Sequence, residues 1–128
     1  DFPKSIWYTF YKAVQYIGEG VQMASGKEFV EYAAEQLREA GEISCRRMFG
    51  EYGWYCDGKF LGVICDDQLF IKITPETEQA FPDFPRMPPY EGAKEYFIVE
   101  DIDNRESFLP LVRATWDALP EPGIKKKK

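Results

Sequence analysis

The stretch that most constrains the fold lies in the middle of the chain, from residue 46 to residue 72: RRMFGEYGWYCDGKFLGVICDDQLFIK. Aromatic and β-branched residues lie there between Gly and Asp residues, a pattern typical of antiparallel strands joined by tight turns. Asp57-Gly58 is a strong signal for a two-residue type I′ hairpin, and Asp66-Asp67 is a second candidate turn. The sequence therefore predicts a β-meander around which a single domain is built, because 128 residues are too few for two comfortable domains.

Two-residue turns would fix the register of the meander. Tyr55 would then lie opposite Phe60, and Ile64 opposite Leu69. One face would be almost purely apolar, and we expect it to face the core: Tyr55, Phe60, Gly62, Ile64, Leu69, Ile71 and Ile73. The other face would be mixed: Trp54, Cys56, Lys59, Leu61, Val63, Cys65, Gln68, Phe70 and Lys72. The apolar members of this second face need a cover, which we expect residues 1–22 or a second copy of the chain to supply.

The chain before the meander contains two segments. Apolar residues at helical spacing, and Ser25 with Glu28 as a capping box, predict a helix over about 26–40. Residues 1–22 are rich in aromatic side chains and also show helical spacing. We interpret them as an N-terminal extension that docks on the domain, and the alternative is a helix that binds a partner.

The chain after the meander should return to the sheet once. Thr74 is a candidate N-cap for a short helix over 75–81, and residues 96–99 read as a further strand. The last helix should end near Leu119, and Pro110 either bends it or lies in its first turn. Together these segments predict an α+β fold with two layers, in which helices pack on one face of an antiparallel β-meander sheet.

Charge and composition exclude several classes of function. The formal net charge is −6 although the C-terminal tail, residues 120–128, ends in four lysines, so the body of the chain is more acidic still. Such a body repels phosphate backbones, and we expect it not to bind nucleic acid directly. The chain has no histidine, which excludes Ser-His-Asp and Cys-His nucleophiles and the common zinc sites that use histidine.

Several candidate sites are better explained by structure than by chemistry. Asp66-Asp67 and the Asp101/Asp103 pair offer too few oxygen ligands for calcium, and we assign them to turns and caps, with Asp103 and Glu106 forming a capping box. No glycine-rich phosphate motif is present. We therefore expect no catalytic residue, no cofactor and no metal.

The three cysteines indicate a reduced, cytoplasmic protein, because their number is odd and no C-x-x-C spacing occurs. Cys56 and Cys65 would lie at opposite ends of one strand, about 20 Å apart at roughly 3.3 Å per residue, too far for a disulfide. Cys45 would lie opposite Cys56 if a two-residue turn occurs at Gly50-Glu51, which makes this pair the disulfide candidate. Cys45 also has a neighbouring cation that could lower the pKa of its thiol. No apolar run reaches the length of a membrane helix, so we expect no membrane contact.

Arg46 and Arg47 form the part of the meander that turn and core chemistry leave unexplained. Successive side chains of a strand point to opposite faces, so one arginine must point toward the side that the helices cover. We expect that arginine to lie at the sheet edge beside an acidic residue of the first or last helix, and the alternative is that it binds a carboxylate or phosphate of a ligand. The candidate interaction or ligand surface consists of Arg46, Arg47, Met48, Phe49, Gly50, Tyr52, Gly53 and Trp54.

Three segments in the same order, ASGKEFVEYAAEQL, RRMFGEYGWYCDG and ICDDQLFIK, resemble the TfoX/Sxy N-terminal domain family. The resemblance covers about residues 23–119, and its most specific part is Arg47-Met48-Phe49-Gly50 followed by Tyr52-Gly53. It implies an α+β domain with helices packed on an antiparallel sheet. It also implies a relation to bacterial regulators of natural competence, the uptake of DNA for transformation, which work with the cyclic-AMP receptor protein at competence promoters.

The leading interpretation is a non-enzymatic, regulatory domain that acts through protein contacts in the bacterial cytoplasm, in a regulatory complex or as a homo-oligomer. One alternative is a small-molecule-binding protein or small enzyme that uses Arg46 or Arg47 and Cys45. Another is DNA binding through the tail Lys125–Lys128.

Overall fold

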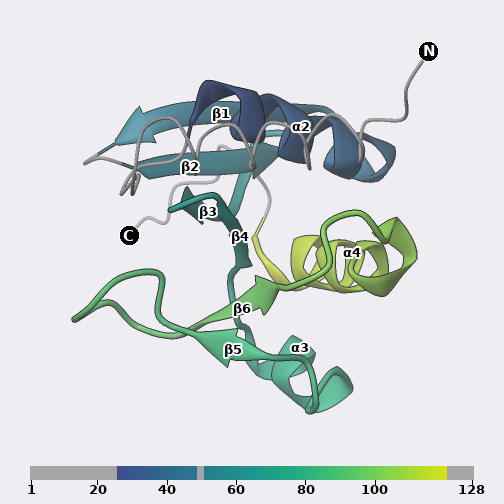
Figure 1. Cartoon of the computed structure of the whole chain (residues 1–128). Coiled ribbons are helices and arrows are strands. Elements are labelled where there is room, and N and C mark those ends of the chain that lie inside the picture. The colour runs from purple at the N-terminus through teal and green to yellow at the C-terminus, as the bar shows by residue number, and fades with distance from the viewer. Residues whose placement is uncertain (1–25, 49–50, 121–128) are drawn as a thin grey trace.

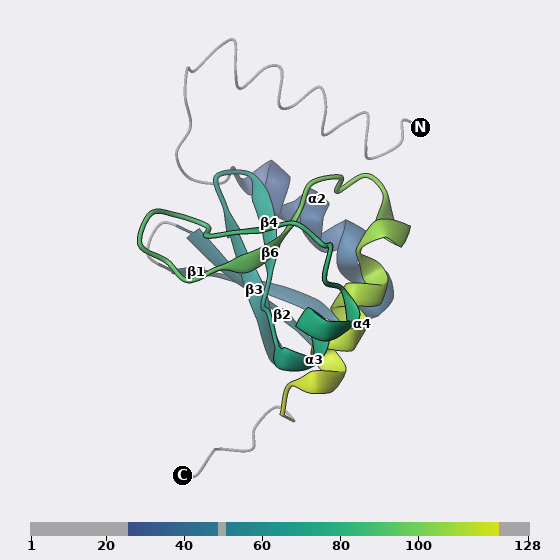
Figure 2. The same cartoon turned by 90° about the horizontal axis from the view of Figure 1, so that it is seen from below.

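The computed structural model describes residues 26–48 and 51–120, which form an open, six-stranded antiparallel sheet with helices gathered on one side (Figures 1 and 2). The order of the strands in the sheet is β1-β2-β3-β4-β6-β5. The strands are β1 (Ile43–Met48), β2 (Glu51–Cys56), β3 (Lys59–Cys65), β4 (Gln68–Ile71), β5 (Arg86–Met87) and β6 (Tyr96–Val99). The helices are α2 (Lys27–Leu37), α3 (Pro75–Ala80) and α4 (Leu109–Ala118), with short 3-10 turns at Arg38–Ala40 and Arg105–Ser107. The predicted α+β fold is confirmed.

Both predicted hairpin turns are present. Asp57 and Gly58 have φ angles of 49° and 87°, and Asp66 and Asp67 have φ angles of 54° and 57°. Type I′ turns require positive φ at both central residues, and aspartate and glycine tolerate this conformation better than most residues. The turns therefore fix the pairing that the sequence predicts, with Tyr55 opposite Phe60 and Ile64 opposite Leu69.

Buried hydrophobic side chains form two clusters on opposite faces of the sheet. The main core lies between the sheet and the helices, and its largest fully buried residues include Phe29, Leu37, Trp54, Leu61, Ile64, Leu69, Ile71, Phe97, Phe108, Leu111 and Val112. The second cluster consists of Val63, Phe70 and Ile98, with Phe60, Cys65 and Tyr96 packed against it.

A β-bulge in β3 determines which side chains share a face. Trp54 lies opposite Gly62, whereas Tyr55 lies opposite Phe60, so Leu61 has no partner in β2. Because side chains alternate along a strand, one extra residue reverses the alternation beyond it. A turn-based register cannot detect this reversal.

Along the chain, the predicted division into faces is therefore correct after the bulge, from Gly62 onward, and wrong before it. Ile64, Leu69 and Ile71 belong to the main core as predicted. Tyr55 and Phe60 lie on the opposite face, and Phe60 packs against the second cluster. Four residues that the prediction places on the mixed face point to the helix side instead: Trp54, Cys56, Lys59 and Leu61.

This correction reduces the number of apolar residues on the mixed face that need a cover. Trp54 and Leu61 are buried in the main core and need no additional cover. Val63 and Phe70 lie in the second cluster. Two covers were expected for them. Residues 1–22 lie outside the described residues, and no finding tests a second copy of the chain, so both stay predictions.

The bulge brings the Trp54 indole across β3. Its Nε1 donates a hydrogen bond to the Phe70 carbonyl oxygen on β4, at 2.9 Å. Gly62 lies beneath this bond, and a Cβ at that position would lie 1.9 Å from the Phe70 oxygen and 2.7 Å from Trp54 Nε1. The position therefore accepts only glycine.

Lys59 fixes the C-terminal end of α4 to the β2–β3 hairpin. Its Nζ donates to the carbonyl oxygens of Trp116 and Leu119, at 2.6 and 2.8 Å, and lies 3.5 Å from the centroid of the Trp116 ring. The indole nitrogen of Trp116 donates to the Cys56 carbonyl oxygen, at 2.8 Å. A cation at this end complements the helix dipole and adds short hydrogen bonds to carbonyl groups at the helix end, where Trp116 otherwise accepts only a 3.4 Å bond from the Leu119 N–H.

The helix ends test the cap predictions. Thr74 is the N-cap of α3, as the sequence predicts. Thr74 and Thr77 form a capping box, in which the side chain of each accepts a hydrogen bond from the backbone N–H of the other. The predicted box of Ser25 and Glu28 is wrong, because Gly26 is the N-cap of α2 and has no capping side chain. The backbone N–H of Gly26 instead donates to Asp67 Oδ1.

The last helix begins late, as one of the two predicted alternatives requires. Residues 105–107 form a 3-10 turn, and α4 starts at Leu109 with Pro110 in its first turn. Asp103 is not a cap, because its carboxylate accepts a hydrogen bond from the Tyr32 hydroxyl and Asn104 precedes the turn. The short strand β5 was not predicted, since it lies in a proline-rich stretch that reads as a loop.

We expect Gly62→Ala to destabilise the fold by roughly 3 kcal/mol or more, because a methyl group there overlaps the Phe70 carbonyl and displaces the Trp54 indole. Urea unfolding followed by tryptophan fluorescence measures the effect. Gly92→Ala is the matched control, since Gly92 has a φ of 92° and open space around it, and strain alone should cost about 1 kcal/mol. Equal losses in the two variants would contradict the steric explanation.

We expect Lys59→Met to destabilise the fold by about 2–3 kcal/mol, because it removes two charge-assisted hydrogen bonds to carbonyl groups at the end of α4. Lys94→Met, at an exposed position, should change the free energy of unfolding by less than about 0.5 kcal/mol. Thermal unfolding by circular dichroism compares the two variants, and an unchanged Lys59→Met protein would show that the cap is dispensable.

Candidate functional site

Arg46 and Arg47 lie on β1, an edge strand that pairs with β2 alone in the described sheet. Both side chains are exposed. The Arg46 guanidinium lies 5.8 Å from the centroid of the Tyr55 ring, and the Arg47 guanidinium lies 5.7 Å from that of Tyr52. Each arginine thus lies over a tyrosine of the neighbouring strand, one on each face of the sheet, near the outer limit of about 6 Å for cation–π contacts. We call these four residues the arginine edge.

The prediction that one arginine pairs with an acidic residue of a helix is wrong. Arg47 shares a face with Tyr52, which packs at the margin of the main core, but the end of β1 that carries it extends away from α2 and α4 (Figures 1 and 2). Between residues that the structure describes, neither guanidinium forms an ion pair with a carboxylate. With respect to the residues that the structure describes, both arginines therefore keep guanidinium donors that no carboxylate occupies.

The structure does not bring the other predicted residues together into one surface with the arginines. Trp54 is fully buried in the main core, so it is not a contact residue. Gly53 lies opposite Arg46, and Met48 lies opposite Glu51. Phe49 and Gly50 lie outside the described residues. Sequence reasoning missed Tyr55, which lies two positions along β2 from Gly53, the partner of Arg46. The predicted turn at Gly50-Glu51 offered a signal, since it would have placed Tyr55 directly opposite Arg46.

Glu51 is a second feature that the sequence did not reveal. Its side chain is only 9% exposed, and its Oε1 has no hydrogen-bond partner among the described residues. Burial raises the pKa of this carboxyl group, and a hydrogen bond with Cys65 partly opposes the shift. The pKa of the Cys65 thiol is raised by burial and by the carboxylates of Glu51 and Asp66. This site therefore disfavours negative charge.

The cysteines do not form the predicted disulfide candidate. Cys45 lies opposite Trp54 and Cys56 lies opposite Ile43, because Met48 pairs with Glu51 and the connection falls one residue earlier than assumed. All three cysteines are free thiols.

Burial makes these thiols weak nucleophiles. It raises the pKa of Cys45, contrary to the expectation that the neighbouring arginine lowers it. The pKa of Cys56 is raised to about 11, by burial and then by the nearby Asp57 carboxylate. Because the thiolate is the reactive form, thiols with raised pKa values are poorly suited to nucleophilic catalysis at neutral pH.

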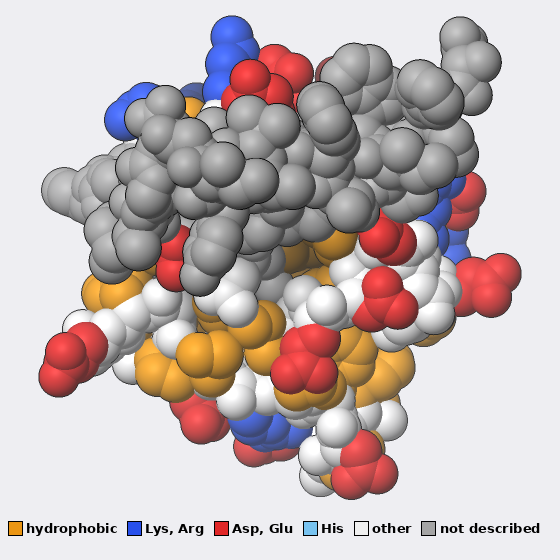
Figure 3. Space-filling view, viewed as in Figure 1, with side chains coloured by type: hydrophobic (Ala, Val, Ile, Leu, Met, Phe, Trp, Pro, Cys, Tyr) orange, Lys and Arg blue, Asp and Glu red, His pale blue; other side chains and the backbone are white. Residues whose placement is uncertain are grey.

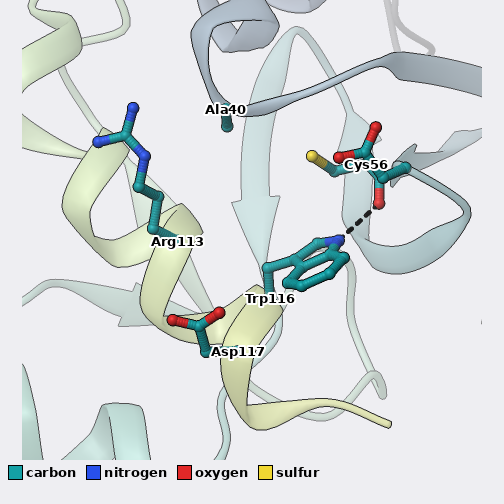
Figure 4. Close-up of a pocket in the computed structure, with 6 residues that line it drawn as sticks. Ala40, Cys56, Arg113, Trp116 and Asp117 are labelled. Atoms are coloured by element: carbon teal, nitrogen blue, oxygen red, sulfur yellow. Dashed lines mark hydrogen bonds between the residues drawn. The ribbon is translucent and has the colours of Figure 1, made fainter. Parts of the chain in front are cut away.

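A pocket of about 220 Å³ lies elsewhere, between α4, the β2–β3 hairpin and the connection after α2 (Figure 4). Its lining residues are Ala40, Cys56, Asp57, Arg113, Trp116 and Asp117. Neither arginine of the arginine edge contributes to it, so this pocket does not support a ligand site built on that pair.

The exposed surface also offers an apolar area. Figure 3 shows hydrophobic side chains gathered on the lower part of one face, with acidic groups between them. Met87 and Tyr90 are the large hydrophobic residues most exposed among those described, at 42% and 54%. They lie at and after β5, an edge strand of only two residues.

None of the helices in the described ranges combines the length and the apolar character that crossing a membrane requires.

Comparison with known proteins agrees with the fold. The model of the TfoX N-terminal domain matches residues 35–119 of this chain. A relative from Spirochaeta aurantia, described as an uncharacterized 12.7 kDa protein in the trpE 5′ region, is 33% identical over 107 residues. The aligned segment covers 83% of this chain and 93% of the relative.

We expect Glu51→Gln to stabilise the protein by about 1 kcal/mol near pH 7, because it removes a buried charge that lacks a full set of partners. The pKa of Glu51 is raised in the folded state, so the wild type is most stable below the ordinary glutamate pKa and loses stability as pH rises through the folded pKa. The advantage of the variant should therefore shrink as the pH falls to about 4.

Urea unfolding across this pH range measures the difference, with Glu91→Gln as the exposed control that should leave stability unchanged. A Glu51→Gln variant that is less stable than wild type near neutral pH would show instead that the carboxylate makes a favourable interaction.

Proposed function

Because the chain belongs to the TfoX N-terminal domain family, we propose that this competence-regulator-like domain is a non-enzymatic regulatory module that acts through protein contacts. The observation that carries the proposal is the arginine edge, a pair of uncommitted cations on an exposed strand of an otherwise acidic chain. The contact surface is Arg46 and Arg47 with the tyrosines beneath them. The partner is a protein that presents carboxylates to them.

The chemistry of this surface suits recognition of carboxylates. A guanidinium group forms paired, charge-assisted hydrogen bonds with a carboxylate and keeps its charge at every physiological pH. Stacking on Tyr52 and Tyr55 restricts each arginine before a partner arrives, so less side-chain entropy is lost on binding. Negative charge on the rest of the chain repels acidic partners from other surfaces and favours this edge.

The remaining chemistry supports a binding role over catalysis. The sequence has no histidine to serve as a general base near neutral pH, and burial raises the pKa of each cysteine. Free thiols also suit the reducing cytoplasm of a bacterium, where we place the protein. The pocket beside α4 is lined by other residues, so it gives no support to the small-molecule alternative built on Arg46 or Arg47. The lysine tail lies outside the described residues, so DNA binding through it stays a prediction.

The test is affinity purification of the tagged chain from its native cell, followed by quantitative mass spectrometry. We expect the Arg46→Ala/Arg47→Ala variant to retain about tenfold less of a partner than wild type, because each lost charge-assisted contact removes about 1 kcal/mol or more. The control is Arg38→Ala/Arg113→Ala, which removes the same charge from two exposed positions on the helical side of the molecule.

Thermal unfolding is the control that checks whether both variants remain folded. Equal retention by wild type and the Arg46/Arg47 variant would overturn the proposal. Equal loss in both variants would show a non-specific dependence on net charge, which also contradicts a dedicated contact surface.

A further inference from the structure

We propose, building on the proposed function, that β1 recognises its partner by strand addition, and that the partner is an extended segment with two consecutive acidic residues. β1 is six residues long and pairs on one side only within the described sheet, so every second residue directs a backbone N–H and C=O away from β2. An added strand satisfies these groups, and its backbone hydrogen bonds supply affinity that is independent of its sequence.

The two edges of the sheet differ in their capacity for strand addition. β5, at the other edge, has only two residues and offers few backbone groups to a further strand. Short edge strands are a common protection against unwanted pairing. β1 is three times as long, and Ser44, Arg46 and Arg47 along it are exposed. Within the described sheet, the long edge is therefore the one open to a partner.

The positions of the arginines define the sequence of the added strand. Arg46 and Arg47 lie on opposite faces of the sheet, each over a tyrosine of β2. Neighbouring residues of an added strand also point to opposite faces, so one residue can meet each arginine. An Asp or Glu at two consecutive positions pairs with both guanidinium groups, whereas two acids separated by one residue reach only one face.

Charge also selects against a second copy of this chain at the same edge. Two copies of β1 paired antiparallel about their centres would bring Arg46 and Arg47 of one copy close to those of the other. Like charges across paired strands are destabilising. The same arginines that attract an acidic strand therefore oppose self-association through β1.

The probe is a displayed library of random 12-residue peptides, selected on the immobilised full-length chain and counter-screened on the folded Arg46→Ala/Arg47→Ala variant. We expect the selected peptides to contain consecutive acidic residues flanked by β-branched or aromatic residues. Synthetic versions should bind wild type at least about tenfold more tightly than the variant. Absence of enriched acidic pairs, or equal binding to both proteins, would overturn the proposal.

Backbone methylation then separates strand addition from a contact between charges alone. Two versions of the best peptide carry N-methyl groups on alternate amides, one version for each edge of the extended chain. Strand addition uses only one edge of the added strand, so one version should lose binding at least tenfold and the other should retain it. Equal behaviour of the two versions, whether both bind or both fail, would overturn the proposal.

This outcome is independent of the test of the proposed function. If the native partner is lost on Arg46→Ala/Arg47→Ala substitution while the two methylated peptides behave equally, the arginine edge is a contact surface but not a site of strand addition. If the native partner is unaffected by the substitution, the proposed function itself fails.

Discussion

The hydrogen bond from Trp54 Nε1 to the Phe70 carbonyl oxygen determines how the two halves of the sheet fit together. To reach β4, the indole must cross β3, and it can do so only because Gly62 has no side chain. The bulge at Leu61 places glycine and indole in register, so that Leu61 and Trp54 both enter the main core. A large aromatic side chain is thereby buried with its one polar group satisfied, which burial of tryptophan requires.

The anchoring of α4 follows from the same region of the sheet. Cys56 and Lys59 flank the Asp57-Gly58 turn and lie opposite each other, on the side that faces the helices. Lys59 therefore reaches the last carbonyl groups of α4, and the Cys56 carbonyl accepts from Trp116. The desolvation of a buried ammonium is offset by two short hydrogen bonds and by the aromatic face beneath it. The β2–β3 hairpin thus sets the strand register and also holds the C-terminal end of α4 in place.

The sequence was informative where structure depends on local chemistry. The Asp-Gly and Asp-Asp turns, the Thr74 cap and the apolar faces of α2 and α4 follow from residues close to one another in the chain. It failed where distant residues decide the outcome. The bulge at Leu61 accommodates the hydrogen bond between Trp54 and Phe70, which are far apart in the sequence. Asp103 accepts a hydrogen bond from the distant Tyr32 instead of capping a helix. For the candidate site, alternation correctly placed Arg46 and Arg47 on opposite faces, but it could not reveal that the helices end short of them.

The arginine edge combines protection with recognition. An exposed edge strand can pair with unrelated strands, and charged side chains along it are a usual defence. Lysine would suffice for that purpose, since a single charge on a flexible stem already opposes association. Arginine adds a planar donor group that matches a carboxylate, and stacking on Tyr52 and Tyr55 holds that group in place on each face. A surface that only repelled other strands would not need its cations to be oriented, so the stacked geometry favours a selective contact over simple protection.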